Sequence, residues 1–226
     1  MMSMAHSLIR GVYAVTPDEP VTKKLTAQVS EALAGGIRLL QYRNKIADRR
    51  LAREQACALR NLAVQAGAQL IINDDIELAL AVSAHGVHLG REDIRIDGEL
   101  VDIHDLRRRA WQAAHPNKCF LVGISCYDQM DAARAASLAG ADYVAFGSFF
   151  SSPTKPDAVR AEMSLIQHAK RELMLPVVAI GGITAENAPQ LIAAGVNAVA
   201  VISSLFGAED IRSRARFLSS LFPENV

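Results

Sequence analysis

Short apolar runs of strand length recur eight times in this chain of 226 residues, and this repetition constrains the fold more than any other feature. Most runs are nearly continuous in Val, Ile, Leu and Ala, which is typical of parallel strands covered by helices. The runs lie at residues 11–16, 37–43, 69–72, 86–89, 120–125, 143–146, 176–180 and 198–202.

The segments between these runs have the periodicity of helices. Several end at a glycine just before the next run, as at Gly67, Gly140 and Gly195, which is the usual signal that stops a helix. The predicted helices span residues 21–34, 47–65, 76–82, 103–114, 129–139, 161–173, 185–194 and 209–221.

Eight alternations of strand and helix predict an α/β fold with a single domain over residues 1–226, the (β/α)₈ TIM barrel. The alternative is a doubly wound open sheet, which needs a topological switch point. No Gly-x-Gly-x-x-Gly pattern follows the first run, and no shift of composition marks a domain boundary. Residues 1–10 precede the first strand and are expected to form a flexible N-terminal segment.

The composition permits a substantial core and argues against strongly charged partners. Hydrophobic residues make up 50% of the chain, and 24 basic residues balance 24 acidic ones. This balance gives no overall field that favours nucleic acid or a membrane surface. Cys57, Cys119 and Cys126 have no metal-ligand spacing and indicate a reducing cytoplasm rather than a disulfide framework. Residues 1–10 lack the apolar core of a signal peptide, and no later run approaches a membrane span.

Two segments that follow predicted strands have the chemistry of phosphate sites. Thr154 and Lys155 lie between two prolines, so they are held on a stiffened loop that suits an anion. In the other segment, Gly181 and Gly182 allow a ligand to approach the backbone closely. Thr184 is then expected to cap a helix whose N-terminus attracts phosphate. Together the two loops predict a site for phosphorylated substrates.

Polar side chains stand at the ends of the apolar runs, where a barrel of this kind has its active site. Gln41, Arg43 and Lys45 are two apart, so on an extended chain they project from the same face. Gln41 can exchange hydrogen bonds with a heteroaromatic ring, Arg43 can clamp a phosphate with two bonds, and Lys45 adds a point charge. The alternative is an exposed strand edge whose charged side chains bind nothing. An arginine inside a buried strand disfavours this alternative.

The carboxylates after the third run predict a cation site. Asp75 is well placed to cap the helix that begins at Ile76, which leaves Asp74 able to coordinate a hard cation. Asp93, after the next run, is the candidate for a second carboxylate. Mg²⁺ suits so sparse a set, because phosphates and water complete its coordination shell. His88 lies in an apolar strand and is interpreted as a core residue.

Residues 91–118 are long for a connection. The run Arg107-Arg108-Arg109 could indicate nucleic-acid binding, but short charge runs are common on solvated helix faces, and we adopt that interpretation. Trp111 is expected on the buried side of the same helix, and Phe217 is expected to pack the last helix on the barrel.

Six motifs, in this order, resemble those of one enzyme family. They are Gln-Tyr-Arg-Asn-Lys (41–45), Ile-Ile-Asn-Asp-Asp (71–75), Gly-Val-His-Leu-Gly-Arg-Glu-Asp (86–93), Pro-Thr-Lys-Pro-Asp-Ala (153–158), Val-Ala-Ile-Gly-Gly-Ile-Thr (178–184) and Val-Ile-Ser-Ser (201–204). Any one of them is a weak signal, but the whole set is highly specific. On these motifs the chain resembles thiamine-phosphate synthase over residues 12–207.

That family has a (β/α)₈ fold and joins hydroxymethylpyrimidine diphosphate to a thiazole phosphate, releasing pyrophosphate and using Mg²⁺. The resemblance implies that Asp74 and Asp93 bind Mg²⁺. It implies catalytic roles for Arg43, Lys155 and Ser125, with Ser125 beside the pyrimidine and the leaving group. The implied contacts of the pyrimidine diphosphate are Gln41, Arg43, Lys45, Asn73 and Lys155, and those of the thiazole phosphate are Ser152, Pro153, Thr154, Gly182, Ile202 and Ser203.

Three features depart from the family pattern. Ser152 stands where threonine is more frequent, and residues 95–118 are longer than expected. Cys126-Tyr127 follows Ser125, where many relatives have a small residue and a histidine.

Two alternative functions are considered. A thiazole tautomerase is a relative that rearranges the thiazole phosphate and uses a histidine two residues after the fifth-strand serine. Here Tyr127 holds that place, while the metal carboxylates and the Arg43 and Lys45 pair are present. A barrel that binds phosphorylated ligands without turnover is the second alternative, and an activity assay separates it from an enzyme.

Overall fold

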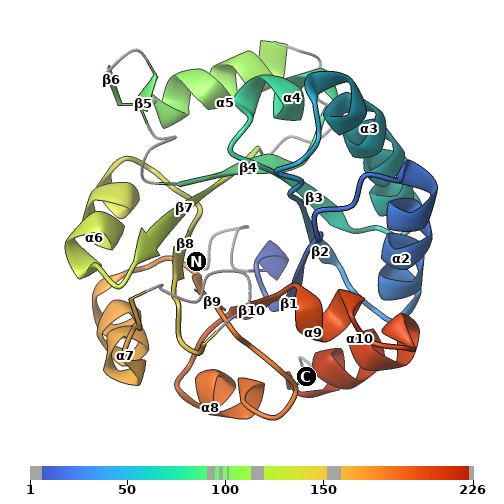
Figure 1. The fold of residues 1–226 in the computed structure, drawn as a ribbon. Coiled ribbons are helices and arrows are strands. Elements are labelled where there is room, and N and C mark those ends of the chain that lie inside the picture. Colours follow the sequence, from blue (N-terminus) through green and yellow to red (C-terminus); the bar gives the residue numbers. More distant parts are fainter. Residues whose placement is uncertain are drawn as a thin grey trace.

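The computed structural model describes residues 7–90, 95–96, 99–100, 102–112, 120–151 and 159–223. Within these residues eight parallel strands close into a barrel (Figure 1). The strands are Gly11–Val15 (β1), Leu39–Tyr42 (β2), Gln69–Asn73 (β3), Gly86–Leu89 (β4), Leu121–Tyr127 (β7), Tyr143–Phe146 (β8), Val177–Ile180 (β9) and Ala198–Val201 (β10). Neighbours pair in the order β1-β10-β9-β8-β7-β4-β3-β2, and β2 pairs again with β1. The predicted barrel is confirmed, and the open sheet is excluded.

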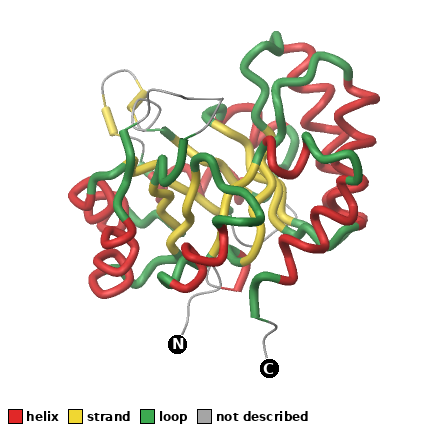
Figure 2. Tube along the Cα trace, turned by 60° about the horizontal axis from the view of Figure 1, so that its bottom comes forward, coloured by secondary structure: helices red, strands yellow, loops and turns green. Residues whose placement is uncertain are grey.

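Helices surround the strands on the outside, as Figures 1 and 2 show from two directions. The eight predicted helices are all present, most of them shorter by one to three residues at an end. They are Thr22–Ala34 (α2), Arg49–Gln65 (α3), Ile76–Ala81 (α4), Ile103–Gln112 (α5), Met130–Leu138 (α6), Met163–Glu172 (α7), Ala188–Ala193 (α8) and Ile211–Ser220 (α10).

Aspartate caps fix where three of these helices begin. The carboxylates of Asp48, Asp75 and Asp210 accept hydrogen bonds from backbone N–H groups three residues ahead, at distances of 2.7, 2.8 and 2.9 Å. Each cap satisfies a donor that the first turn of a helix leaves without a partner. The predicted role of Asp75 is confirmed.

Three elements were not predicted. A one-turn helix, Ser203–Phe206 (α9), follows β10 directly. An antiparallel pair, Arg95–Ile96 (β5) and Glu99–Leu100 (β6), lies in the long connection after β4. The extra length of that connection therefore includes a small two-stranded sheet beside α5 (Figure 1).

The core has two layers, because successive side chains of a strand point to opposite sides. The outer layer packs beneath the helices and includes Leu25 of α2 and Leu59 of α3. The inner layer fills the barrel and includes Tyr13, Leu39, Ile71, Leu121, Tyr143 and Val178. Ile9, within the segment that was expected to be flexible, is fully buried in this inner layer.

Two aromatic side chains do not lie where the sequence predicted. Trp111 is 67% exposed on α5, and Phe217 is 52% exposed on α10. The buried stripes of these helices are formed by other residues, Ile103, Leu106 and Ala110 in α5 and Ala215 and Leu218 in α10.

The arginine run of α5 is engaged in ion pairs. Arg107 contacts Asp142 at 2.8 Å, Arg108 pairs with Asp105, and Arg109 pairs with Glu77. These contacts agree with a solvated helix face. Among the described residues, no helix is long and apolar enough to cross a membrane.

Candidate active site at the carboxyl ends of the strands

Parallel strands place all of their carboxyl ends at one mouth of the barrel. The last inward-facing residues of four neighbouring strands there are polar, and Asn73 of β3 lies in register with His88 of β4. The other two are Gln41 of β2 and Ser125 of β7, both predicted as site residues. The fold therefore brings these predicted residues to the same end of the barrel.

Arg43 lies one residue beyond β2 and is not inside the strand, which corrects the prediction. The hydroxyl of Thr16 accepts from the N–H of Arg43 at 2.8 Å and donates to its carbonyl at 2.7 Å. These side-chain bonds replace the strand ladder, so the chain leaves the sheet there. Lys45 lies in the following turn and is exposed, so the common face predicted for an extended chain does not apply to it.

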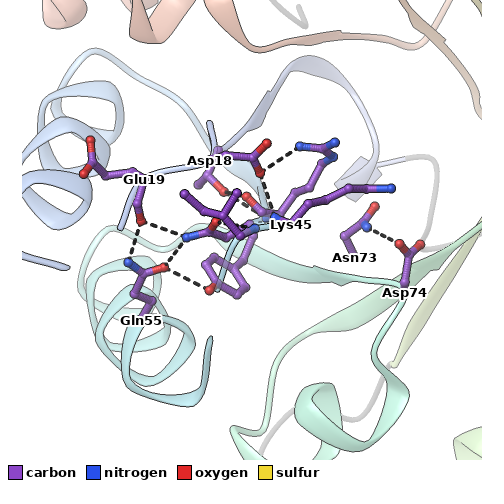
Figure 3. Close-up of polar contacts among 11 residues, drawn as sticks. Asp18, Glu19, Lys45, Gln55, Asn73 and Asp74 are labelled. Carbon is purple, nitrogen blue, oxygen red and sulfur yellow. Dashed lines mark hydrogen bonds and ion pairs between the residues drawn. The ribbon is translucent and has the colours of Figure 1, made fainter. Parts of the chain in front are cut away.

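Asp18 neutralises Arg43 from the loop after β1. Its Oδ1 lies 3.1 Å from Nη1 of Arg43 and accepts from the backbone N–H of Lys45 at 2.7 Å (Figure 3). The arginine side chain is only 15% exposed, so this contact offsets part of the cost of withdrawing a charge from water. An anionic ligand at Arg43 therefore has to compete with Asp18.

A buried glutamine joins the loops after β1 and β2. Oε1 of Gln55, from α3, accepts from the hydroxyl of Tyr42 and the amide of Asn44, both at 2.9 Å. Its Nε2 donates to the carbonyl of Glu19 at 2.9 Å (Figure 3). Burial raises the pKa of Tyr42 to about 12, so the phenol keeps the proton that it donates. Sequence reasoning missed Gln55, although a polar residue within the apolar stripe of α3 was the available signal.

We expect Gln55→Ala to lower the free energy of unfolding by about 1–3 kcal/mol, because it leaves the buried Tyr42 hydroxyl without its acceptor and removes one of the two donors to the Glu19 carbonyl. The matched control is Gln65→Ala, at the exposed end of the same helix, where the change should stay within about 0.5 kcal/mol. Denaturant unfolding measures both. Equal effects at the two positions would contradict the role given to Gln55.

Asp74 adopts a left-handed backbone conformation directly after β3. Its φ is 64°, a region that aspartate and asparagine enter more easily than other non-glycine residues. The backbone N–H donates to the carbonyl of His88 at 2.8 Å, and one carboxylate oxygen accepts from Nδ2 of Asn73 at 2.6 Å (Figure 3). Backbone strain of this kind is concentrated at functional sites, which is consistent with the choice of Asp74 as a candidate site residue.

His88 is buried in β4, as predicted for a core residue, but it also contacts Ser125. Its Nε2 lies 2.8 Å from the Ser125 hydroxyl, and its Nδ1 lies 3.1 Å from the hydroxyl of Tyr143. Sequence reasoning did not connect His88 to the site, because its partners come from strands that are distant in the chain.

The loops after β8 and β9 pack on each other through their backbones. The N–H groups of Phe149 and Phe150 donate to the carbonyls of Ile180 and Gly181, at 3.2 and 3.0 Å. A Cβ at Gly182 would lie 2.2 Å from the carbonyl oxygen of Ser151. This glycine is therefore required for contact between the two loops, a function that the sequence prediction did not include.

Gly182→Ala is expected to destabilise the fold by about 3 kcal/mol or more, since a left-handed φ of 62° costs about 1–3 kcal/mol and the clash with Ser151 adds to it. Gly195→Ala is the control, because it has a φ of 101° but meets nothing nearer than Lys170 Cγ at 3.8 Å. Thermal and denaturant unfolding of the two variants measure the difference. A cost at Gly182 no larger than that at Gly195 would show that the loop contact is unimportant.

The helix after β9 does not begin at Thr184, so that prediction is wrong. α8 begins at Ala188, and Oδ1 of Asn187 accepts from the backbone N–H of Thr184 at 2.8 Å. The amide of Asn187 also donates to the carbonyl of Gly182 at 2.9 Å, which closes the loop. The predicted Ile202 and Ser203 lie at the start of α9, at the same mouth of the barrel.

Five predicted site residues lie outside the described residues. They are Asp93, Ser152, Pro153, Thr154 and Lys155. Among the residues that are described, no group of three or more His, Cys, Asp or Glu side chains is placed to hold a metal ion.

Residues 126 and 127, which depart from the family pattern, point in different directions. Cys126 is buried toward the helices, and burial raises the pKa of its thiol to about 12. Tyr127 follows a bulge, has a φ of 53° and is 43% exposed. The side chain that takes the place of a tautomerase histidine is thus a tyrosine at the rim.

Comparison with known proteins agrees with the motifs. The family model described as thiamine monophosphate synthase matches residues 12–205. A curated thiamine-phosphate synthase of Thiobacillus denitrificans is 50% identical over 212 residues, which cover 94% of each chain. Another, of Nitrosospira multiformis, is 48% identical over 95% of this chain and 86% of its own.

A solved structure has the same fold. The thiamine phosphate pyrophosphorylase of Pyrococcus furiosus superposes with a TM-score of 0.78 and is 32% identical, with 97% of each chain covered. The match spans every strand whose end contributes to the candidate site. The chain therefore belongs to the thiamine monophosphate synthase family.

Proposed function

We propose that this protein condenses hydroxymethylpyrimidine diphosphate with a thiazole phosphate to give thiamine phosphate and pyrophosphate. The observation that carries the proposal is the identity of about one half, along nearly the whole length, with enzymes named thiamine-phosphate synthase. The polar groups gathered at the mouth of the barrel supply the chemistry that this transfer requires.

The reaction breaks the bond between the pyrimidine methylene and an oxygen of the diphosphate. The electron-rich aminopyrimidine shares the positive charge that develops on the methylene, so the protein has mainly to stabilise the departing pyrophosphate and align the thiazole nitrogen. Arg43, Lys45 and Lys155 are the proposed cations for the pyrophosphate. The guanidinium of Arg43 already contacts one anionic group, the carboxylate of Asp18, which supports its assignment as an anion-binding side chain.

Gln41 and Asn73 are proposed to hold the pyrimidine diphosphate, and Ser125 to contact the pyrimidine and the leaving group. Gly182, Ile202 and Ser203, together with residues 152–154, are proposed for the thiazole phosphate. The backbone N–H groups of a tight loop and of a first helical turn suit a phosphate dianion.

Mg²⁺ is the proposed cofactor, with Asp74 and Asp93 as its protein ligands. The donor set fits this ion, because Asp74 offers a hard oxygen at the mouth of the barrel and Mg²⁺ normally takes one or two carboxylates plus phosphate and water. When bound, the ion would neutralise charge on the pyrophosphate. Asn73, which donates to Asp74, would orient the carboxylate.

The purified protein tests this proposal directly. It should form thiamine phosphate, detected by mass spectrometry, from the two substrates with Mg²⁺, and the Thiobacillus denitrificans synthase is the positive control. A thiazole tautomerase would instead interconvert thiazole isomers without using the pyrimidine diphosphate. A binding barrel would form complexes and no product. Either result, with an active control, would refute the proposed function.

A further inference from the structure

Five polar side chains form one continuous line of hydrogen bonds across the barrel interior. Nε2 of Gln41 donates to the Tyr13 hydroxyl at 2.9 Å, and the hydroxyls of Tyr13 and Tyr143 are 2.8 Å apart. The line continues from Tyr143 to Nδ1 of His88 at 3.1 Å and from Nε2 of His88 to Ser125 at 2.8 Å. It joins two proposed substrate contacts, Gln41 and Ser125, through three buried residues to which the proposed function assigns no role.

A glycine makes room for this line. Gly123 of β7 lies in register with His88 of β4 on one side and with Tyr143 of β8 on the other. A Cβ at Gly123 would lie 2.0 Å from Cζ of Tyr143, so the tyrosine ring occupies the space of the missing side chain. The ring stacks on His88 with centroids 5.5 Å apart, and it packs against the Tyr13 ring in a T-shaped arrangement with centroids 6.0 Å apart.

The placement of the Gln41 amide sets the arrangement of protons along the line. With Nε2 of Gln41 as the donor to Tyr13, the Tyr13 proton has an acceptor within the line only if it is donated to Tyr143. The Tyr143 proton then goes to Nδ1 of His88, so the neutral imidazole carries its own proton on Nε2. That N–H donates to Ser125, whose hydroxyl proton is left for a group beyond the line.

Both tyrosines remain donors because they are buried. Tyr13 and Tyr143 are no more than 1% exposed, and burial raises the pKa of each phenol above its ordinary value. Both phenols therefore keep their protons, and the hydrogen-bonding direction of Gln41 at one end is coupled to that of Ser125 at the other.

We propose that Tyr13, Tyr143 and His88 are positioning residues that set the hydrogen-bonding directions of Gln41 and Ser125 for the transfer reaction. With Nε2 of Gln41 engaged, its carbonyl Oε1 is the group that accepts a bond from an aminopyrimidine N–H. Ser125 presents its hydroxyl proton as a donor to the bound substrate. This inference rests on the proposed function for the identity of the ligand, whereas the direction of the line rests on the contact distances and on Nε2 of Gln41 facing Tyr13.

The same arrangement excludes one role for Ser125. An imidazole that already carries its proton on Nε2 cannot take the proton of the serine, so it cannot activate the hydroxyl as a nucleophile. Ser125 therefore acts by donating a hydrogen bond, although it lies at hydrogen-bonding distance from a histidine.

The tautomer of His88 is the first test, and it needs no activity. Nitrogen NMR of the protein with isotope-labelled histidine, assigned by comparison with His88→Gln, should show the proton of His88 on Nε2. Tyr143→Phe should remove the donor to Nδ1 and shift the His88 signals. A proton on Nδ1 in the native protein would overturn the inference, whether or not the proposed function holds.

Kinetics provide the second test. His88→Gln keeps an N–H donor in reach of Ser125, whereas His88→Asn is too short, so kcat should fall less than about threefold in the first and about tenfold or more in the second. The control is His85→Asn, because His85 immediately precedes β4, at the opposite end of the strand from the site, and its Nδ1 accepts from the N–H of Leu70 at 2.8 Å. This variant should keep its kcat.

A double-mutant cycle separates positioning from general damage to the fold. Tyr143→Phe should lower kcat in the native background by about tenfold but have little effect when Ser125 is already alanine, because both changes interrupt the same line. Equal losses in the two backgrounds, or equal losses in His88→Gln and His88→Asn, would contradict the proposal. If the native protein formed no thiamine phosphate, the proposed function would fail and the NMR experiment would still decide the direction of the line.

Discussion

Arg43→Lys should lower kcat on the order of 10² or more while changing the KM for the pyrimidine diphosphate much less. A guanidinium presents two parallel donors to a phosphate group, and an ammonium cannot reproduce that geometry. Charge accumulates on the pyrophosphate as the bond to the methylene breaks, so the contact strengthens in the transition state. The structure adds that Arg43 is held by Thr16 at the end of β2 and by Asp18 opposite its guanidinium.

Steady-state kinetics with each substrate varied measure this effect. Arg50→Lys, on the exposed face of α3, is the control and should behave as the native enzyme. Binding of thiazole phosphate, measured by calorimetry, should be nearly unchanged in Arg43→Lys. A normal kcat with only a raised KM would mean that Arg43 binds ground state and transition state alike, and its catalytic role would be withdrawn.

The second large effect is expected at Asp74, the first of two neighbouring carboxylates. Asp74→Asn should lower kcat by about 10² and raise the Mg²⁺ concentration that gives half-maximal activity, because an amide is a poorer ligand for a hard cation. Asparagine also tolerates the left-handed φ of 64°, so the change tests the charge and preserves the backbone.

Asp75→Asn is the matched control for Asp74→Asn. Asp75 caps α4 through the N–H of Leu78, so its replacement can cost at most about 1 kcal/mol of stability and should leave kcat unchanged. Titration of activity with Mg²⁺ after treatment with a chelator compares the two variants. An unchanged Mg²⁺ dependence in Asp74→Asn would remove Asp74 from the metal site.

Much of the fold could be predicted from the sequence because its signals are local. Apolar runs of strand length and the glycines after them mark the strands and the ends of the helices, and Gly67, Gly140 and Gly195 do have positive φ. The boundary of β2 could not be predicted in the same way, because the hydroxyl of Thr16, which follows β1, ends it.

The candidate site could be predicted only in part, because some of its residues have local signals in the sequence and others depend on contacts between distant segments. Gln41, Asn73 and Ser125 follow from their places at strand ends. The role of His88 depends on Tyr143 and on the space left by Gly123, which are distant from it in the chain. The position of Trp111 was predicted wrongly because the prediction used only the apolar character of its side chain. The buried stripe of α5 is formed by Ile103, Leu106 and Ala110, and Trp111 lies outside it.

The central claim is that this protein couples release of pyrophosphate to formation of thiamine phosphate. Phosphorus NMR of a reaction with both substrates and Mg²⁺ follows the two products together. We predict equal amounts of pyrophosphate and thiamine phosphate, and no rapid pyrophosphate release when the thiazole phosphate is omitted. Loss of the pyrimidine diphosphate without thiamine phosphate, or no reaction where the Thiobacillus denitrificans synthase is active, would contradict the account.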